Sequence, residues 1–546
     1  MREGHRVLDP RPTAAPVPLA ARPGTRARRL VLFDNGKLGP PYGRWMPALG
    51  PLHAMLAELG EVTLERSDLL MDDPESHRLR VDDWGERGID GVVFGLCDAG
   101  VTQPTILLAA AAEAAGIPTA VLCIEPVIEL AAVAASFRAP GLPLVTLEAD
   151  RLAGPEAIAA AARACRDAVV QALTRPPADH EARFAQRFPF TRGLGQADAG
   201  VRAEDFAAFA RENRMGDGLP LVPPGEFLVQ RFVEVGGRPA DAVLIEQLQP
   251  SGAPLTVKQA AICAAMAGCE PSSFPIVLAM LEAIGAPEYR LHLASITTHP
   301  GGNLVVVSGA AATAAGMHSG RGCLGPGHHV NATIGRTLSL ILINVARAIP
   351  GLSALSLLAS PAQFSCCLAD RSDGPYPSLA ATLGAGERSI VWAQKCEVHD
   401  VLDHLSEAPE ALLTTFCRVA ATVGGNNAYL PSDLMLILNP EHAALLARRG
   451  WSREDIGAFV FATARNLRSE VVGRGVKGEW PEQWSDWDSV PVVPGPDRVW
   501  TVVAGAPGPH SAVTVPWGYG AATWRPIIAP GATEVDRHDS DRRVSA

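Results

Sequence analysis

Residues 29–37 read R-L-V-L-F-D-N-G-K, an apolar run that ends in a polar turn. A continuous apolar run of this length, closed by turn residues, is typical of a β-strand that is buried on both faces. Two more such runs follow, I-D-G-V-V-F-G-L at 89–96 and I-P-T-A-V-L-C-I at 117–124. Between the strands, residues 47–59 and 102–115 have helical spacing. Strands and helices that alternate at this length predict an α/β fold class with a doubly wound parallel sheet.

The length of the chain predicts more than one domain, because 546 residues are too many for a single hydrophobic core. Prolines, glycines and charges mix around 174–200, which is typical of a linker. In chain order, the sequence predicts an extended arm at 1–27, a doubly wound α/β domain at 28–173, the linker at 174–200, a larger α/β or α+β domain with glycine-rich loops at 201–535, and a disordered tail at 536–546.

Composition limits the classes of function. Hydrophobic residues make up 47% of the chain and charged residues 19%, which is typical of a soluble globular protein. The net charge is −11 and no basic run stands out, which disfavours nucleic acid and anionic membranes as partners. The N-terminus lacks an apolar signal core and no later apolar run has spanning length, so we expect a cytoplasmic protein. The ten cysteines form no C-x-x-C pair, which favours reduced thiols over disulfides or structural zinc.

Polar residues follow two of the predicted parallel strands. In doubly wound sheets, ligands bind outside the carboxyl ends of the strands. Lys37 closes the first strand, and Asp98 and Thr102 follow the strand at 89–96, so these side chains are candidates to bind substrate in one crevice. Thr102 as a helix N-cap and Asp98 as a turn residue explain the same positions without a ligand.

Four short segments carry a resemblance to a known family: V-L-D-P at 7–10, L-F-D-N-G-K at 32–37, G-L-C-D-A-G-V-T at 95–102 and G-I-P-T at 116–119. Together they resemble the bacterial family named for its Sec/Cys-Gly-Ser-Cys (UGSC) motif. The resemblance covers about residues 6–175 and implies that family's scaffold.

The residues of the motif itself differ from the family's pattern. In the UGSC family, the turn after the strand holds a thiol or selenol pair, which suits redox chemistry at a helix N-terminus. Asp98 and Gly100 match that motif, whereas Ala99 stands in place of the Sec or Cys and Thr102 in place of the second Cys. Cys97 lies one position too early to take over the role. We therefore predict that this turn carries no redox cycle.

The second half resembles the module that accompanies the UGSC domain in some bacterial proteins. The resemblance lies in G-D-G-L-P-L-V-P-P at 216–224, M-A-G-C at 266–269, T-T-H-P at 297–300, L-G-P-G-x-x-x-N-A-T-I-G-R at 324–336, and N-P-E-H-A followed by G-W-S. These matches imply a shared fold and origin, and they transfer no reaction.

The glycine-rich loop at 318–336 leads into an apolar helix that we expect to begin near Thr333. The first turn of a helix presents unpaired N–H groups and partial positive charge, which favour an anion. We predict an anion site to which Asn331 and Arg336 contribute, together with the backbone of Gly325 and Gly327. In the alternative interpretation, the glycines serve packing and Arg336 is a structural clamp.

Further polar residues of the second half lie at predicted loop ends. The candidates for catalysis are Cys269, His299, Cys367, Asp370 and His510, and those for substrate binding include Asp217 and Ser511. A histidine beside a cysteine lowers the thiol pKa and makes a nucleophile available, whereas a buried inert thiol is the alternative for each cysteine. A metal site would draw on His299, His318, His328, His329 and Cys323. No H-x-x-x-H or H-E-x-x-H spacing supports it, so we expect no bound metal and no cofactor.

These features predict a bacterial cytoplasmic enzyme with its main site in the second half. Its substrate would be a small anionic metabolite, a carboxylate, that reacts at a carbon–heteroatom bond in lyase-like or thiol-dependent chemistry. Neither a dinucleotide fingerprint nor a nucleophile elbow is present. The alternative is a non-catalytic ligand-binding or scaffold protein derived from a thiol or selenol redox enzyme. A homo-oligomer is compatible with either interpretation.

Overall fold

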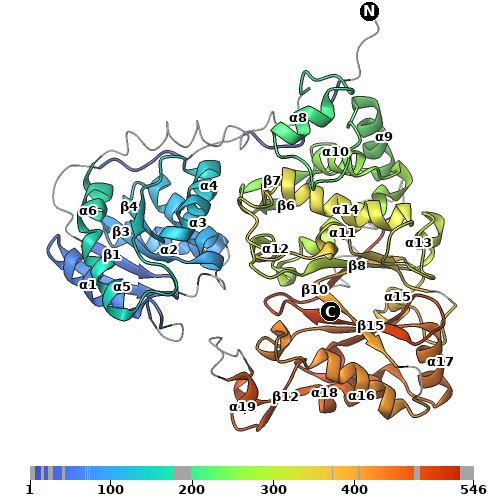
Figure 1. Ribbon diagram of the computed structural model, residues 1–546. Coiled ribbons are helices and arrows are strands. Elements are labelled where there is room, and N and C mark those ends of the chain that lie inside the picture. The colour runs from blue at the N-terminus through green and yellow to red at the C-terminus, as the bar shows by residue number, and fades with distance from the viewer. Residues whose placement is uncertain are drawn as a thin grey trace, which may run out of the picture.

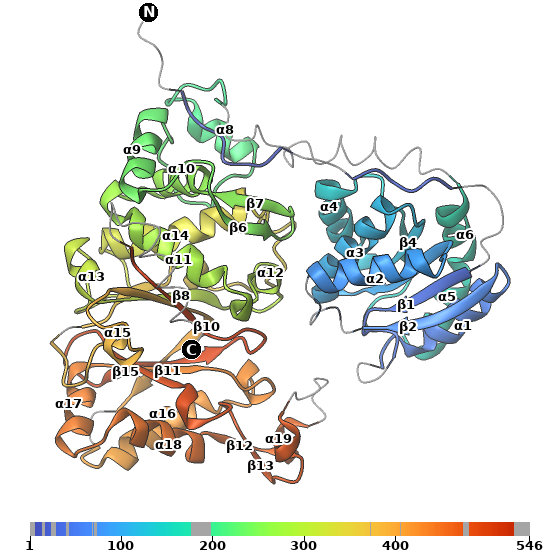
Figure 2. The ribbon, with the colours of Figure 1, turned by 180° about the vertical axis from the view of Figure 1, so that it is seen from behind.

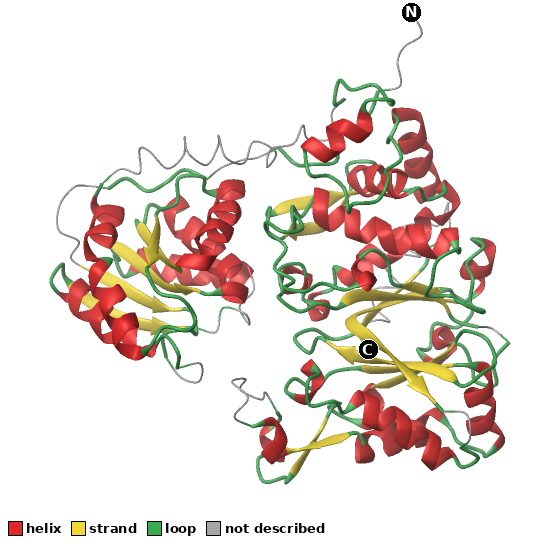
Figure 3. Cartoon of the chain, viewed as in Figure 1, coloured by secondary structure: helices red, strands yellow, loops and turns green. Residues whose placement is uncertain are grey.

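The computed structural model is a mixed α/β structure, shown as a ribbon in Figure 1 and by secondary structure in Figure 3. It describes residues 6–13, 17–22, 29–39, 43–67, 69, 72, 74–175, 198–371, 373–403, 406–472 and 480–528. The predicted tail and nearly all of the predicted linker lie outside the described residues.

The N-terminal domain is a five-stranded parallel sheet in the order β2-β1-β3-β4-β5. Contacts pair α1 with α5 and α3 with both α2 and α4, so helices cover the two faces. The doubly wound α/β domain is therefore confirmed. Its elements are β1 (Arg29–Asp34), α1 (Met46–Ala57), β2 (Glu61–Arg66), α2 (Pro74–Glu86), β3 (Gly91–Cys97), α3 (Thr102–Ala114), β4 (Thr119–Ile124), α4 (Ile128–Arg138), β5 (Leu144–Leu147), α5 (Pro155–Ala164) and α6 (Arg166–Thr174).

The order of these strands creates a switch point. From β1 the chain first moves outward to β2, and it then crosses back to β3 on the other side of β1. At such a point the two loops after β1 and β3 run in opposite directions and leave a crevice at the carboxyl edge of the sheet. Lys37 follows β1 and Asp98 follows β3, so both belong to this edge.

The predicted N-terminal arm is an extended strap, which we define as residues 6–13 and 17–22. Its first part joins the C-terminal unit, because Val7 and Leu8 are buried in that unit's core and bridge to Gly225 and Asp198. Its second part joins the N-terminal domain through the buried ion pair between Arg22 and Glu113, 2.6 Å apart. The strap therefore ties the two units together.

The C-terminal unit contains a seven-stranded mixed sheet with the path β14-β11-β15-β10-β8-β9, and β16 pairs with β10. The long strand β10 (Ile390–Leu402) organises it: residues 390–396 pair with β8 (Gly302–Ser308), and residues 396–402 pair with β15 (His510–Pro516). The other strands are β6 (Val243–Leu248), β7 (Ala253–Thr256), β9 (Cys367–Ala369), β11 (Leu434–Leu438), β12 (Arg465–Leu467), β13 (Ser489–Pro491), β14 (Val499–Val503) and β16 (Thr523–Pro526).

Helices lie on both sides of this sheet, as Figure 2 shows from behind. The group that includes α10, α11 and α14 lies on one side, and α16, α17 and α18 lie on the other. The helices are α8 (Phe206–Glu212), α9 (Glu226–Gly236), α10 (Val257–Ala267), α11 (Phe274–Ile284), α12 (Leu291–Ala294), α13 (Ala310–Ala314), α14 (His329–Asn344), α15 (Leu379–Thr382), α16 (Pro409–Ala420), α17 (Pro440–Arg448), α18 (Arg453–Thr463) and α19 (Arg468–Val471).

Helix α14 begins earlier than the sequence suggests. The expected start near Thr333 is wrong, because the amide of Ala332 already donates to the carbonyl of His328, 3.0 Å away. The hydroxyl of Thr333 donates to the carbonyl of His329, as inside a helix. Thr333 therefore lies in the first turns of α14 and Arg336 lies deeper in the helix.

Candidate functional site

The segment 297–303, T-T-H-P-G-G-N, runs into β8 beside the middle of β10, where Gly302 lies opposite Cys396. Successive side chains of a strand point to opposite faces, so Lys395, Glu397 and His399 share one face of β10. The contact between Nζ of Lys395 and the carbonyl of Gly301 shows that this face meets the segment. The pairing of β8 with β10 therefore places a polar cluster where β10 leaves β8 and joins β15.

His299 and Glu397 form the centre of this cluster. The backbone N–H of Gly301 donates to Nδ1 of His299, 3.1 Å away, so Nδ1 is an acceptor and the neutral ring carries its proton on Nε2. That Nε2 lies 3.1 Å from Oε1 of Glu397, and Nε2 of His399 lies 3.3 Å from Oε2. Two contacts lower the pKa of Glu397 to about 2. The contact with His299 is the larger cause and the contact with His399 is the smaller one. Glu397 is therefore anionic at neutral pH. It is hydrogen-bonded to His399, and it faces Nε2 of His299, which has no aligned hydrogen-bond partner among the described residues.

Lys395 is the basic residue of the cluster, and only 8% of its surface is exposed. Its Nζ donates to the carbonyl of Gly301, 2.9 Å away. Burial lowers the pKa of Lys395 to about 8. Near neutral pH a much larger share of such amines is unprotonated than of ordinary lysines, whose pKa is about 10.4. Lys395 therefore offers an amine lone pair near neutral pH.

A cavity of about 240 Å³ lies beside Lys395 and His299. Oγ1 of Thr297 accepts the indole N–H of Trp517 at 3.0 Å and the amide of His299 at 3.2 Å, so the hydroxyl proton is left for another acceptor. The remaining lining residues are Asp217, Ala294, Ser295, Asn303, Ser339, Leu342, Ile343, Ala348, Pro350, Ala354, Leu355, Ser356, Ala359, Ser360, Gln363 and Phe364.

Two further polar groups of this cavity have donors to offer. The hydroxyl of Tyr289 donates to Oδ1 of Asn303, 2.6 Å away, which fixes the side-chain amide and leaves its NH₂ group for another partner. The hydroxyl of Ser360 is buried and has no hydrogen-bond partner among the described residues. Lys395, Thr297, Asn303 and Ser360 thus give a mostly apolar cavity several hydrogen-bond donors, which suits an anionic ligand.

Gly301 has to be a glycine for this arrangement. A Cβ at this position would lie 2.5 Å from Cε1 of His299 and 2.7 Å from the carbonyl oxygen of Cys396. We expect Gly301→Ala to lower the free energy of unfolding by about 1–3 kcal/mol, measured by urea denaturation, because the packed segment has to move.

Gly154→Ala is the matched control, because a Cβ there meets nothing within 4 Å. Equal stabilities of the Gly301→Ala and Gly154→Ala proteins would show that the segment is not closely packed at Gly301.

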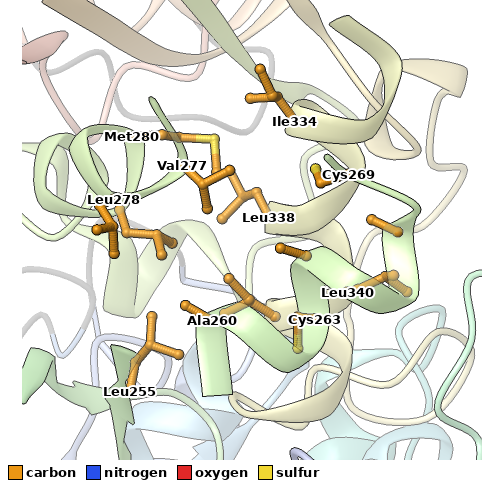
Figure 4. Close-up of a cluster of buried hydrophobic side chains, with 14 of the residues drawn as sticks. Leu255, Ala260, Cys263, Cys269, Val277, Leu278, Met280, Ile334, Leu338 and Leu340 are labelled. Atoms are coloured by element: carbon orange, nitrogen blue, oxygen red, sulfur yellow. The ribbon is translucent and has the colours of Figure 1, made fainter. Parts of the chain in front are cut away.

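The cysteines predicted to be catalytic lie in the core. All ten cysteines are free and buried. Sγ of Cys269 lies 3.2 Å from Oγ1 of Thr337, and Figure 4 shows Cys269 beside Ile334 and Leu338 in an apolar cluster. Burial raises the pKa of both Cys269 and Cys367. At neutral pH these thiols are protonated, so the structure gives no support to thiolate chemistry at Cys269 or Cys367.

The predicted catalytic residues are distributed along the sheet and do not converge. Asp370 accepts hydrogen bonds from Ser308 at the far end of β8 and from the amide of Leu379, and burial raises its pKa. His510 is exposed at the opposite end of β10, with Nδ1 3.1 Å from Asp400. With a rise of about 3.4 Å per residue, each lies roughly 20 Å from the middle of β10. Among the predicted catalytic residues, only His299 borders the cavity.

Ser511 lies in a separate buried network. Nε2 of His442 donates to the carbonyl of Asp403 at 2.6 Å, so Nδ1 is an acceptor and receives the hydroxyl proton of Ser511, 2.8 Å away. Oγ of Ser511 also accepts a hydrogen bond from the backbone N–H of Asn439. These contacts close the start of α17 against β15, which explains Ser511 as a structural residue.

Asn331 and Arg336 are occupied by protein partners. The side chain of Asn331 is buried, accepts from the amide of His318, and donates to the carbonyls of His318 and Cys323, so it clamps the two ends of the glycine-rich loop. Arg336 forms a two-pronged ion pair with Asp217 at 2.7 and 2.9 Å. Arg336 and Asp217, which were both predicted to bind substrate, therefore bind each other. The backbone of Gly325 and Gly327 is exposed, and the anion site there stays a prediction.

At the N-terminal domain, Lys37 and Asp98 border one larger cavity, of about 530 Å³. Asp98 accepts the indole N–H of Trp45 at 2.8 Å and pairs with Arg151. Thr102 is fully buried and is not among the residues that line this cavity. The structure thus brings Lys37 and Asp98 together without Thr102.

Sequence reasoning missed Lys395, Glu397, His399 and Asn303. The stretch at 390–400, I-V-W-A-Q-K-C-E-V-H-D, contains a usable signal, because ionisable residues recur at every second position after an apolar start. A buried strand that carries such a row on one face is unusual and indicates a site.

Fold and site together define a mixed α/β protein whose polar centre joins a buried lysine to a carboxylate–imidazole cluster. No protein-family model and no curated protein matches the chain. The resemblance to the UGSC family therefore stays a prediction. Within the described ranges, no group of three or more His, Cys, Asp or Glu side chains is arranged to hold a metal ion. Over the same part of the chain, no helix has the length and apolar character needed to cross a membrane.

Proposed function

We propose that this chain is a lyase-like enzyme that acts on a small carboxylate with a heteroatom substituent on the third carbon. The amine of Lys395 takes a proton from C2, next to the carboxylate. The C–H electrons form a double bond between C2 and C3, and the substituent leaves with the electrons of its bond to C3. The ammonium of Lys395 then returns a proton to the leaving group or to water, which restores the amine.

The observation that carries this proposal is the buried amine of Lys395 at the wall of the cavity, with its pKa lowered to about 8. A general base works best when its pKa lies near the working pH. An ordinary lysine is almost fully protonated at neutral pH and has little base to offer. Burial of the amine supplies the needed shift.

The cavity also offers groups for the negative charge that develops when the C2 proton leaves. Thr297 and Asn303 are fixed by their bonds to Trp517 and Tyr289, and their remaining hydrogens are available to a carboxylate oxygen. Donors held in place before the reaction stabilise such charge most effectively. A volume of about 240 Å³ lies just below the range of about 300–1,000 Å³ that is common for ligand pockets, which suits a small metabolite.

His299 and Glu397 position the base in this scheme. Glu397 lies 3.1 Å from Nε2 of His299. Nδ1 of His299 accepts a hydrogen bond from the N–H of Gly301, and the carbonyl of Gly301 accepts one from Nζ of Lys395. Because Nδ1 of His299 is engaged in this way, and Nε2 faces the Glu397 carboxylate without an aligned hydrogen bond, in this proposal His299 is a positioning residue and not the base. The chain of contacts fixes the amine relative to the cavity wall.

The test is hydrogen exchange at C2, which needs no knowledge of the leaving group. The full-length protein is incubated in D₂O near pD 8 with 3-hydroxy, 3-amino and 3-sulfanyl carboxylic acids, followed by proton NMR. We expect deuterium at C2, or an unsaturated acid, from at least one of these classes. Acids that bind the protein and show neither change would contradict the proposal and favour the non-catalytic binding protein.

A further inference from the structure

The larger cavity lies between the two units and is lined by both. The N-terminal domain contributes Lys37, Arg44, Asp98, Gly100 and Arg151. The C-terminal unit contributes Trp517 and further residues, among them Thr298, Asn426 and Tyr519. With about 530 Å³, the cavity has more than twice the volume of the one beside Lys395. We propose that this cavity binds a phosphorylated small molecule through Lys37, Arg44 and Arg151.

The first argument is charge. The lining residues include three cationic side chains and one carboxylate, in a protein whose net charge is −11. The carboxylate of Asp98 is already paired with Arg151 and accepts the indole N–H of Trp45. Arg44 is exposed and forms no ion pair with any described residue. Arg44 therefore adds to the cavity wall a positive charge that pairs with no described carboxylate, and a multiply charged anion would neutralise it.

The second argument is position in the fold. Lys37, Asp98 and Arg151 follow β1, β3 and β5, so the cationic wall lies at the carboxyl edge of the parallel sheet. The crevice of the strand order opens between β1 and β3 at this edge, and ligands of doubly wound sheets bind there. Gly100, just before α3, also lines the cavity, so the partial positive charge of that helix start adds to the same wall.

The third argument is the opposite wall. Trp517 and Tyr519 supply aromatic surface, and Asn426 is held by a hydrogen bond from its Nδ2 to the carbonyl of Trp517, 2.9 Å away. An apolar and aromatic wall that faces a cationic wall suits a ligand with an organic body and a phosphate end. Thr297 borders both cavities, but Lys395 does not line this one, so pyrophosphate binding through Lys37 and Arg44 tests this site separately from the proposed elimination.

The test uses pyrophosphate as the probe and the full-length protein. Isothermal titration at low ionic strength is expected to show binding that weakens as sodium chloride is added. Arg44→Gln and Lys37→Gln are each expected to weaken binding about tenfold, since each removes a charged contact to the anion. Arg231→Gln is the matched control, because Arg231 is an exposed arginine on α9 outside this cavity.

Wild-type affinity in the Arg231→Gln protein, with losses in the two cavity variants, would support the proposal. Absence of binding at millimolar pyrophosphate, or equal affinity in all four proteins, would overturn it. Thermal unfolding without ligand checks that the variants are folded. Arg44 is exposed, so the Arg44→Gln protein decides the matter if Lys37→Gln fails to fold.

Discussion

Lys395→Met is expected to lower the rate of C2 hydrogen exchange by about a hundredfold or more, while the protein stays folded. The substitution keeps the length of the side chain and removes the amine, and general bases typically contribute factors of about 10²–10⁴. Lys395→Arg is expected to lose the activity as well, because a guanidinium stays protonated and cannot accept the proton. The measurement is proton NMR in D₂O with whichever acid the wild type exchanges.

The pH profile gives the second readout for Lys395. Its pKa is lowered to about 8, so the unprotonated amine is the minor form below pH 8 and the major form above it. The exchange rate should rise about tenfold per pH unit up to pH 7 and level off above pH 8 to 9. Lys258→Met on α10 is the matched control and should keep this profile. A profile that is flat from pH 6 to 9 would assign the base to another group.

Arg336→Ala is expected to lower the free energy of unfolding by about 3 kcal/mol or more, measured by urea denaturation. The side chain of Arg336 is 14% exposed and that of Asp217 is 5% exposed, so removal of the guanidinium leaves a buried carboxylate without its partner. Asp217→Asn together with Arg336→Ala should recover part of the loss, because the unpaired charge is then gone.

Arg78→Ala provides the control for Arg336. Arg78 pairs with Glu75 and Asp82 on the surface of α2, where its side chain is 58% exposed. Ion pairs at such exposed positions contribute little to stability, so the Arg78→Ala protein should unfold almost as the wild type does. If Arg336→Ala behaved like Arg78→Ala and instead abolished anion binding at the glycine-rich loop, the anion-site interpretation of Arg336 would be correct.

The N-terminal domain was predictable because the sequence patterns that indicate its strands and helices lie within short stretches of the chain. The apolar runs that form β1, β3 and β4 end in turn residues, and helical spacing fills the intervals. In the second half, α11 (Phe274–Ile284) carries the same kind of local signal, a continuous apolar run of helical length. The path of the seven-stranded sheet was not predictable, since it depends on pairings such as β11 with β14, whose partners lie far apart in the sequence.

The site follows the same division. His299 was visible in the sequence because glycine and proline surround it, but the role of Lys395 depends on a contact with Gly301, 94 residues earlier in the chain. Its lowered pKa is produced by burial, which no local pattern reports. Arg336 and Asp217 were each predicted to bind substrate. They are 119 residues apart in the sequence, so no local pattern could show that they form an ion pair with each other.

The strap has a consequence for the order in which the chain acquires its structure during synthesis. Val7 leaves the ribosome early, whereas its partner Gly225 is made about 220 residues later, roughly 10–45 s at common elongation rates. Arg22, by contrast, needs only Glu113, which the N-terminal domain itself supplies. All the partners that the N-terminal domain needs are thus synthesised before the C-terminal unit that residues 6–13 pack against. We therefore expect a bulky group attached just before residue 6 to hinder the docking of residues 6–13 on the C-terminal unit, and not the folding of the N-terminal domain.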